Sequence, residues 1–291
     1  MTEMPTVKKI DALRKRKSIY LVSLQELIEN KNKVIIKIPD DPEVAFNKVT
    51  RNILEKVRTE WRWPAGGAAI IIKANGEAFL LSLLRDKGAP TYGGHTTLST
   101  GLGGCEEDLE NPLQIGREAI EEIIIATPRG VIVPTFDIKP FGESIDIKSI
   151  VKIGADLRPE TQSLPLIEAS ARIVRLSGEK EVRIVWKNKT SVCKGLVVVD
   201  KGVRGIDILQ IAEIDLGNAN LEDLKIFDGE IVGGNPLNRD LIVYKLDKKT
   251  LTPTGKIVGR YSSGKFSVPA DGTSFPQTPV LQAVLQELAK E

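Results

Sequence analysis

The feature that most constrains the fold is a pair of apolar runs, residues 68–72 and 78–84, with only five residues between them. The spacer contains Asn75-Gly76, and these two residue types tolerate the positive φ angles that a type I′ turn demands. Two apolar runs joined by such a turn predict a β-hairpin. The chain is therefore expected to contain an antiparallel pair of strands, and the other elements are assigned around it.

Further apolar runs on both sides of the hairpin predict additional strands. One precedes it at 34–38 and is stopped by Pro39. The others follow it, at 131–136, 171–176, 182–186, 196–199 and 241–244. Residues 137–170 match neither the strand period nor the helix period, and we interpret them as an insertion.

Helices are predicted, from apolar residues at helical spacing, at 21–28, 44–57, 112–126 and 278–290. The third of these has clear boundaries. Asn111 is a suitable N-cap, Pro112 fits the first helical position, and Pro128 disfavours helical geometry at the residue before it. The order of hairpin, helix, several strands and helix predicts an α+β or α/β sandwich.

The 291 residues are interpreted as an N-terminal extension (1–62) followed by one domain (63–291) that carries the insertion. A hydrophobic content of 41% and a formal charge of +2 describe a globular chain without a strong general affinity for nucleic acid or membranes. A basic run at 8–17 fits the solvated face of a helix, while a contact with RNA is left open.

Cys105 and Cys193 are the only cysteines, and they lie far apart without metal-ligand spacing. Two cysteines do not make a disulfide scaffold, so a reducing cytoplasm is expected, although a single bridge between them is left open. No apolar run approaches the ~20 residues needed to cross a bilayer. We expect a cytoplasmic protein without a membrane partner, and a homodimer is left open.

Charge divides the predicted helix at 112–126 into two faces. At about 100° per residue its apolar side chains fall on one arc, whereas Glu118, Glu121 and Glu122 lie together on the opposite arc. Like charges at this spacing repel by roughly 0.2–0.5 kcal/mol per pair, and a divalent cation would remove that repulsion. Oxygen ligands of this kind suit Mg²⁺ or Mn²⁺. Taken alone, the same pattern is typical of a solvated helix surface.

The spacing around this helix is more specific than its acidic face. Gly103 stands fourteen residues before Arg117, residues 117–122 read Arg-Glu-Ala-Ile-Glu-Glu, and the aliphatic Ile125 follows. In this register the segment resembles the signature of the Nudix hydrolase family. The upstream Asn-Gly hairpin and glycine-rich loop look like the family's approach to that signature, so the resemblance covers residues from about 66 to 126.

The resemblance implies an α+β fold, namely a Nudix-type α/β/α sandwich with the N-terminal extension and the insertion added. It also implies a hydrolase that uses Mg²⁺ to cleave a phosphoanhydride bond in a nucleoside diphosphate linked to another moiety. The metal, Mg²⁺ or Mn²⁺, would be held by Glu118, Glu121, Glu122 and the backbone carbonyl of Leu102. Arg117 would hold Glu121 in place, and we assign Glu118 as the general base.

Two positions depart from the signature. Leu109 replaces its first Glu, which supports the metal site in the family, and Ile124 replaces the glycine after the Glu pair. Glu106, Glu107 and Glu110 are near enough in sequence to substitute for the missing acid. The departures keep a catalytically weak or inactive nucleotide-binding module as an alternative. A hydrolase acting on the 5′ end of RNA is a third interpretation, supported by the basic run and by the tryptophans before the hairpin.

Substrate contacts are expected from the loops that lead to the signature. Arg85 and His95 would contact phosphates or a sugar, and Gly103 and Gly104 would let backbone N–H groups approach a phosphate. An additional acid is expected from a later loop, and the candidates are Asp228, Glu230 and Glu213. For each of these residues a solvated or structural role is the alternative.

Overall fold

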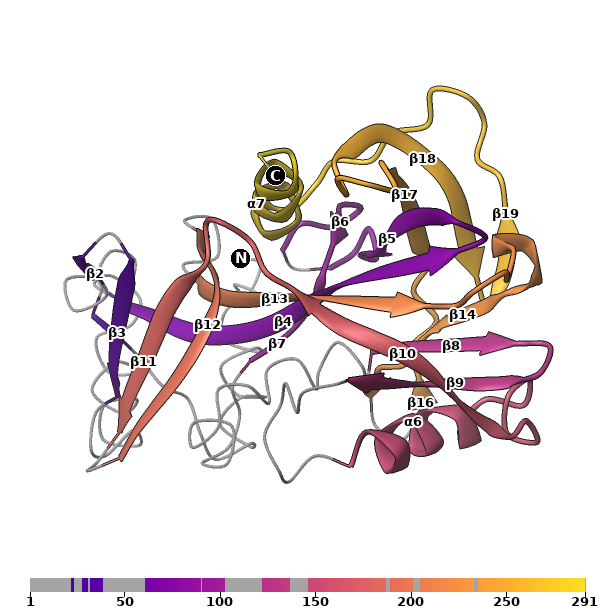
Figure 1. Cartoon of the computed structure of the whole chain (residues 1–291), viewed down its shortest axis with the longest axis horizontal. Helices are drawn as coiled ribbons and strands as arrows, with labels where there is room; N and C mark the ends of the chain where they lie inside the picture. Colours follow the sequence, from indigo (N-terminus) through magenta and orange to yellow (C-terminus); the bar gives the residue numbers. More distant parts are fainter. Residues whose placement is uncertain are drawn as a thin grey trace, which may run out of the picture.

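The computed structural model describes residues 22–23, 28–30, 32–38, 61–89, 91–102, 122–136, 146–186, 189–200, 205–232 and 235–290. Most of them lie in strands (Figure 1). In chain order these are β1 (Val22–Ser23), β2 (Ile28–Asn30), β3 (Lys33–Ile38), β4 (Trp61–Ala74), β5 (Glu77–Leu84), β6 (Thr96–Thr97), β7 (Ser99–Leu102), β8 (Ile123–Thr127), β9 (Gly130–Phe136), β10 (Leu166–Val174), β11 (Lys180–Trp186), β12 (Lys189–Asp200), β13 (Gly205–Asp215), β14 (Lys225–Asp228), β15 (Ile231–Val232), β16 (Asn235–Pro236), β17 (Leu241–Leu246), β18 (Pro253–Ser262) and β19 (Lys265–Ser267). The helical elements are α6 (Ile147–Asp156), the 3-10 turn η3 (Leu221–Asp223) and α7 (Pro279–Leu288).

Two long strands, β4 and β13, form the centre of the sheet (Figure 1). They pair in parallel over eleven positions, from Gly205 opposite Trp63 to Asp215 opposite Lys73. Within β4, alternate apolar side chains enter two different cores, because successive residues of a strand point to opposite faces. Both faces of the central pair are therefore buried, which explains why residues 68–72 form a continuous apolar run.

The predicted hairpin is confirmed. Strand β5 pairs antiparallel with β4 down to Ala74 opposite Glu77. The two turn residues, Asn75 and Gly76, have φ angles of 49° and 72°, as a type I′ turn requires. Beyond β5 the sheet continues antiparallel through β17, β18 and β19.

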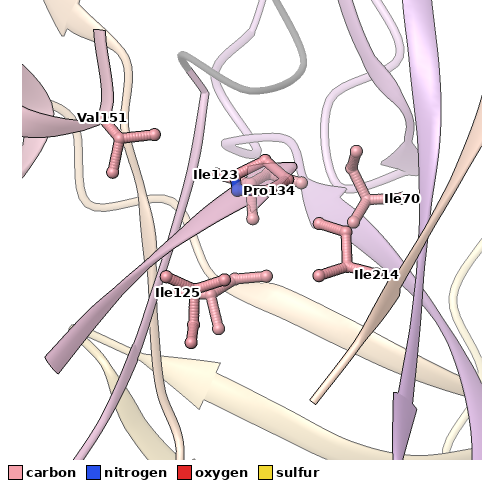
Figure 2. A pocket seen from close by; sticks show the side chains of 7 residues that line it. Ile70, Ile123, Ile125, Pro134, Val151 and Ile214 are labelled. Atoms are coloured by element: carbon pink, nitrogen blue, oxygen red, sulfur yellow. The ribbon is translucent and has the colours of Figure 1, made fainter. Parts of the chain in front are cut away.

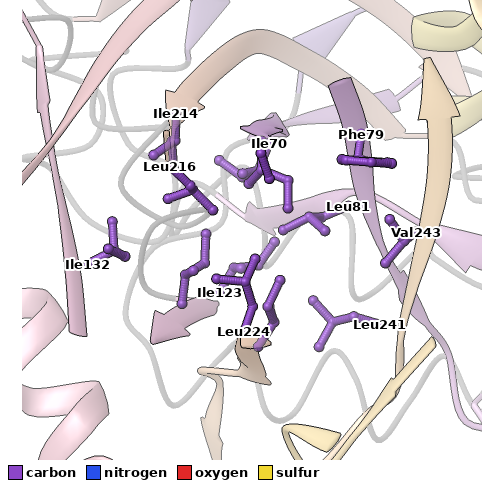
Figure 3. Packing of buried hydrophobic residues seen from close by; sticks show 14 of the residues in the cluster. Ile70, Phe79, Leu81, Ile123, Ile132, Ile214, Leu216, Leu224, Leu241 and Val243 are labelled. Carbon is purple, nitrogen blue, oxygen red and sulfur yellow. The ribbon is translucent and has the colours of Figure 1, made fainter. Parts of the chain in front are cut away.

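On the other side of the central pair the sheet continues through β10, β9, β8 and β14. Strand β10 pairs antiparallel with β13 and parallel with β9. Strand β14, the last on this side, contacts β17, β18 and β19 of the other side. The sheet therefore curls until it is nearly closed, and the side chains on its inner face form the largest core, shown in Figure 3.

A small gap lies beside this core (Figure 2). It measures about 10 Å³ and is lined by Ile70, Ile123, Ile125, Ile132, Pro134, Val151 and Ile214. A space of this size holds at most one water molecule, and its apolar walls provide no hydrogen-bond partners for one. The gap is a packing defect and offers no site to a ligand.

Helix α7 confirms the helix predicted at 278–290. Its N-cap is Thr278, whose hydroxyl accepts a hydrogen bond from the backbone N–H of Leu281 at 3.4 Å, and Pro279 occupies the first turn. Leu281 and Val284 are fully buried in a second core, on the opposite face of β4 from the first. Among the residues that the structure describes, no helix is long and apolar enough to span a membrane.

Helix α6 packs on β8 and β9 (Figure 1). Its Val151 and Ala155 form a third core with Ile124 and Phe227. The prediction that 137–170 fits neither helix nor strand is wrong here, because α6 and the first residues of β10 lie inside that range. Within α6 itself Ile147, Ile150, Val151 and Ala155 do follow helical spacing, and the irregular residues on both sides of this short helix obscure it when the whole range is considered.

The N-terminal strands pair with later parts of the chain. Strand β3 confirms the strand predicted at 34–38 and pairs in parallel with β11, while β1 pairs with β4. The five strands predicted downstream of residue 130 are also confirmed, as β9, β10, β11, β12 and β17. The helix expected at 21–28 is wrong, because β1 and the start of β2 fall in that range. The helix expected at 44–57 lies outside the described residues.

The predicted α+β fold, a Nudix-type α/β/α sandwich, is wrong. The described residues are dominated by one curled, nearly closed sheet, instead of a sheet held between two helical layers. The helix expected at 112–126 contributes to the error, since Ile123–Thr127 form the buried strand β8. Three consecutive isoleucines favour a strand, and a short buried strand cannot be distinguished from a helix end by periodicity. The rest of that expected helix lies outside the described residues.

Candidate functional site

Five charged side chains from separate segments meet at one place. Arg85 directly follows β5, and Glu122 directly precedes β8. Asp228 ends β14, and Glu230 and Arg239 lie between β14 and β17. We refer to these five residues as the charged cluster.

One antiparallel pairing brings two of the acids together. Strand β14 pairs with β8 so that Asp228 lies opposite Ile123, the residue after Glu122. The backbone N–H of Gly229 then donates to the carbonyl oxygen of Glu122 at 2.7 Å. The register of this pair therefore fixes the backbone from which both carboxylates project.

A second antiparallel pairing brings the two arginines to the cluster. Strand β17 pairs with β5 so that Leu241 lies opposite Leu83. Arg239 stands two residues before Leu241, and Arg85 stands two residues after Leu83. Because antiparallel strands run in opposite directions, the start of β17 lies beside the end of β5. Both arginines therefore lie just beyond the same end of this pair of strands.

Arg239 lies at the centre of the cluster. Its Nε donates to Oδ2 of Asp228 at 2.7 Å and its Nη2 to Oδ1 at 2.9 Å, which makes a bidentate ion pair. The same Nη2 lies 2.7 Å from Oε2 of Glu230 and 3.8 Å from Oε2 of Glu122. Burial lowers the pKa of Arg239, but the hydrogen bonds and charge of Asp228 outweigh burial and leave this pKa above its ordinary value. One largely buried guanidinium thus faces three carboxylates.

Glu122 is held by two segments besides its own. The hydroxyl of Ser99 donates to Oε2 of Glu122 at 2.6 Å, and Nη2 of Arg239 approaches the same oxygen. Ser99 begins β7 and lies opposite Ala68 of β4, so the sheet sets the position of this donor. Glu122 is only 8% exposed. Its carboxylate therefore has a fixed orientation in the interior of the site.

Arg85 is bound to the loop that follows it. Its Nε donates to the carbonyl oxygen of Thr91 at 2.9 Å, and its Nη2 to the Thr91 hydroxyl at 3.3 Å. Burial, followed by the positive charge of Arg239, lowers the pKa of Arg85, while Glu230 and Glu122 act in the opposite direction. Arg85 therefore interacts electrostatically with Arg239, Glu230 and Glu122.

The same loop carries His95. Its carbonyl oxygen accepts a hydrogen bond from the backbone N–H of Arg85 at 2.9 Å, and its ring lies 5.5 Å from the ring of Tyr92. The loop turns at Gly93, where a Cβ atom would lie 2.3 Å from the carbonyl oxygen of Lys87. Only glycine allows this approach of two backbone segments. The turn thus keeps His95 beside Arg85.

The structure brings together four of the residues predicted from the sequence, namely Arg85, Glu122, Asp228 and Glu230. Glu213 lies on β13, where it binds Arg172 and Lys73. Leu102 ends β7 opposite Ala65. Other predicted residues lie outside the described part of the chain, and these are Gly103, Gly104, Arg117, Glu118 and Glu121.

Ile124, one of the two departures from the signature, has a structural explanation. It is 1% exposed in β8 and packs in the third core with α6. A Cβ on Gly154 of α6 would lie 2.6 Å from Cδ1 of Ile124, so the two residues are matched in size. Leu109, the other departure, lies outside the described residues.

Two participants were not predicted from the sequence. Arg239 and Ser99 belong to no motif, and each lies next to other polar residues, as is common near strand ends. Their role depends on the pairing of β5 with β17 and of β4 with β7, which has no local sequence signal. The opposite charges of Arg239 and of Asp228 and Glu230 are consistent with such a site, but this complementarity can be recognised only after the fold is known.

Cys193 has no chemical role in this site. It is buried in β12, and burial raises the pKa of its thiol to about 12. A thiol with so high a pKa is not a nucleophile at neutral pH. The bridge to Cys105 that the sequence leaves open involves a residue outside the described ranges.

A magnesium ion requires several oxygen ligands at one place. Within the described ranges, no three His, Cys, Asp or Glu side chains are grouped to hold a metal ion by themselves. Both carboxylate oxygens of Asp228 bind Arg239, so Asp228 is a poor ligand. Glu122 and Glu230 supply the oxygen donors that Mg²⁺ prefers, and Glu121 is joined to Glu122 by one peptide bond. Among the described residues the ligand set for Mg²⁺ is therefore incomplete, because two carboxylates remain to bind one and Arg239 faces both of them.

Comparison with known proteins gives no relative. No family model, no curated protein and no solved structure matches this chain. The features of this chain that indicate a function are therefore the charged cluster and the signature-like spacing that ends at Glu122.

Proposed function

We propose that this protein is a magnesium-dependent hydrolase that cleaves a phosphoanhydride bond in a nucleoside diphosphate linked to another moiety. The observation that carries the proposal is the location of Glu122. It ends the run at 117–122 that resembles the Nudix signature, and it is buried beside Glu230, Arg239 and Arg85. Carboxylates for a metal and cations for a phosphate are the groups that phosphoanhydride hydrolysis needs in one place.

The acids in and near the signature supply the metal ligands in this proposal. Glu118, Glu121 and Glu122 hold the ion, together with the backbone carbonyl of Leu102. When bound, Mg²⁺ supplies charge neutralisation at the phosphate oxygens and makes an attacking water more acidic.

The remaining residues bind the substrate and transfer the proton. Glu118 accepts the proton of the attacking water, and Arg117 keeps Glu121 in place. Arg85 is preorganised by its two hydrogen bonds to Thr91, so it neutralises a phosphate at little entropic cost. His95 contacts the phosphates or the sugar, while Gly103 and Gly104 offer backbone N–H groups.

One observation favours a second candidate, a non-catalytic module that binds a nucleotide. Arg239 already provides a positive charge to Glu122, Glu230 and Asp228. Arg239 and Arg85 together offset most of the negative charge of the three acids, so a nucleotide can bind without a metal ion. Leu109, in place of the first signature Glu, is consistent with this candidate.

Incubation with a nucleotide panel and Mg²⁺ distinguishes the candidates. Hydrolysis that stops when EDTA is added supports the proposal, and binding without turnover supports the second candidate. Activity confined to capped or 5′-triphosphate RNA would redirect the proposal to RNA ends. Wild-type turnover in both Glu121→Gln and Glu122→Gln would rule out the assigned site. Glu77→Gln is the matched control, because Glu77 lies on β5 in a partly exposed ion pair with Lys245.

A further inference from the structure

We infer that Tyr92 is a positioning residue, which fixes the guanidinium of Arg85 in the orientation that binds a diphosphate. The inference rests on the proposed function, because that proposal assigns a phosphate to Arg85. Tyr92 lies in the loop 86–95 that follows Arg85, and the structure describes this loop at 86–89 and 91–95. The contacts that carry the inference all lie between described residues.

The charge of Arg85 is available to an anion. The three acids of the charged cluster form their ion pairs with Arg239, and among the described residues none forms an ion pair with Arg85. Thr91 binds both Nε and Nη2 of Arg85, so the position of Thr91 sets the plane of the guanidinium. The remaining N–H groups of Arg85 can donate to a phosphate.

Tyr92 ties this loop to the central sheet. Its hydroxyl donates to Oδ1 of Asp200 at 2.7 Å, although the two residues are 108 positions apart in sequence. Asp200 ends β12 opposite Gly205 of β13 and is only 2% exposed. Apart from bonds to Arg85, no other described residue of the loop hydrogen-bonds outside it. The position of the loop therefore depends on the Tyr92 hydroxyl.

The backbone at Tyr92 lets adjacent residues bind different parts of the molecule. Its φ angle is 52°, in the left-handed region that large side chains seldom adopt. The carbonyl oxygen of Tyr92 accepts the backbone N–H of His95 at 3.1 Å, which closes the turn. Thr91 can therefore bind Arg85 while Tyr92, the next residue, binds Asp200.

The Tyr92 hydroxyl remains a donor at neutral pH. Burial, followed by the hydrogen bond to Asp200, raises the pKa of Tyr92 above its ordinary value of 10. The hydroxyl therefore keeps its proton, and the bond to Asp200 is present under all conditions in which nucleotides are stable.

Stability alone does not account for this anchor. Residues 86–88 are exposed and add little to any core. Ordering exposed residues costs conformational entropy, which a single hydrogen bond hardly offsets. What the anchor provides is a fixed location for Thr91, and with it a preorganised cation at the mouth of the charged cluster.

The experiment measures the Kd of ADP by calorimetry in the presence of Mg²⁺, together with amide hydrogen exchange of residues 86–95. Tyr92→Phe removes only the hydroxyl. The Kd is expected to rise about 10-fold, as for the loss of one hydrogen bond to a charged group, and exchange in the loop should become faster. Unchanged ADP affinity in Tyr92→Phe would overturn the inference, as would a wild-type protein that binds no ADP.

A double-mutant cycle tests whether Tyr92 acts through Arg85. In an Arg85→Met background, Tyr92→Phe should change the Kd of ADP by less than about two-fold, because residues that act through one contact are not additive. A further rise of about 10-fold in that background would mean that Tyr92 acts through general loosening of the fold, and would overturn the inference. If Tyr92→Phe did not fold, Tyr92→Phe/Asp200→Asn makes the same test without leaving a buried carboxylate short of a donor.

Tyr261→Phe is the matched control. Its buried hydroxyl on β18 donates to the carbonyl oxygen of Leu221 at 2.7 Å, so the same group is lost elsewhere in the sheet. Its ADP affinity and loop exchange should equal the wild-type values, and a loss equal to that of Tyr92→Phe would overturn the inference. Tyr92-dependent ADP binding without hydrolysis of any nucleotide would refute the proposed function alone. Mg²⁺-dependent hydrolysis by the wild type, with unchanged ADP affinity in Tyr92→Phe, would refute the inference alone.

Discussion

Two groups of ionic contacts in this sheet use the same residue types in opposite proportions. On β13, the single carboxylate of Glu213 binds Arg172 at 2.6 Å and Lys73 at 3.2 Å. In the charged cluster, the single guanidinium of Arg239 faces three carboxylates. The first group has an excess of cations around one acid, and the second has an excess of acids around one cation.

The two groups also differ in their access to water. The side chain of Arg172 is 62% exposed, whereas that of Arg239 is 13% exposed. Arg172 and Lys73 are in contact with water, so solvent screens the excess positive charge of the first group. Carboxylates that outnumber a buried arginine keep an attraction for a further cation. The comparison therefore separates a structural ion pair from a cluster suited to binding.

The largest expected difference concerns stability. Replacing Asp228 by Ala removes the bidentate partner of Arg239, and the expected cost is about 3 kcal/mol, the lower end of the range for breaking a buried ion pair, because Glu230 and Glu122 still face the guanidinium. Replacing Glu213 by Ala exposes its cations to water, so that change is expected to cost about 1 kcal/mol. Urea unfolding followed by circular dichroism measures both values. Equal losses for the two variants would remove the distinction between the two groups.

The next largest effect concerns turnover. Glu122→Gln keeps the size of the side chain and its hydrogen bond from Ser99 but removes the charge that a metal requires. Turnover of the best substrate in the nucleotide panel is expected to fall by roughly 100-fold or more, with little change in Tm. The matched variant is Glu213→Gln, which should keep wild-type turnover. A fall of similar size in Glu213→Gln would mean that global stability, rather than the charged cluster, controls activity.

The contrast between elements explains how much of the fold could be predicted. The hairpin at Asn75-Gly76 and helix α7 carry their own signals, namely residues with positive φ and a Thr-Pro start, and both are confirmed. Strand β8 does not, because three isoleucines followed by Ala and Thr continue the apolar arc of a helix as well as they form a strand. The curled sheet depends on pairings between distant strands, such as β4 with β13, that have no local signal.

The same division applies to the candidate site. Residue type and spacing were sufficient to nominate Glu122, Arg85 and the acids at the end of β14 and just beyond it. They were insufficient for Arg239 and Ser99, whose partners lie 11 and 23 residues away in sequence and are reached through strand register. They also nominated Glu213, whose carboxylate the structure shows bound to two cations. Sequence therefore identifies the kinds of groups in a site more reliably than it identifies their arrangement.

A smaller effect on stability is expected from the hydrogen bond between Ser99 and Glu122 in the charged cluster. Ser99→Ala removes the hydroxyl that donates to Oε2 of Glu122 at 2.6 Å. A hydrogen bond to a charged group contributes about 1.5–3 kcal/mol, and Arg239 compensates for part of the loss, so the lower end of that range is expected. Chemical denaturation gives the value, and Ser99→Thr, which keeps a hydroxyl, serves as the control. A loss of stability in Ser99→Thr equal to that in Ser99→Ala would mean that packing of β7, rather than the hydrogen bond, is responsible.

The smallest expected effect is a pH dependence of the other group. Burial raises the pKa of Glu213, but hydrogen bonds from Arg172 and Lys73 outweigh burial and leave this pKa below its ordinary value of 4.5. A lowered pKa in the folded state means that the stabilisation is complete above about pH 4.5 and is lost as the pH falls through the folded-state pKa. The difference in unfolding free energy between wild type and Glu213→Gln, about 1 kcal/mol at neutral pH, should therefore stay constant from pH 7 to about 5 and then shrink. If that difference in unfolding free energy increased as the pH fell, the interaction would have the opposite sign. Arg172 and Lys73 would then not be stabilising the charged form of Glu213.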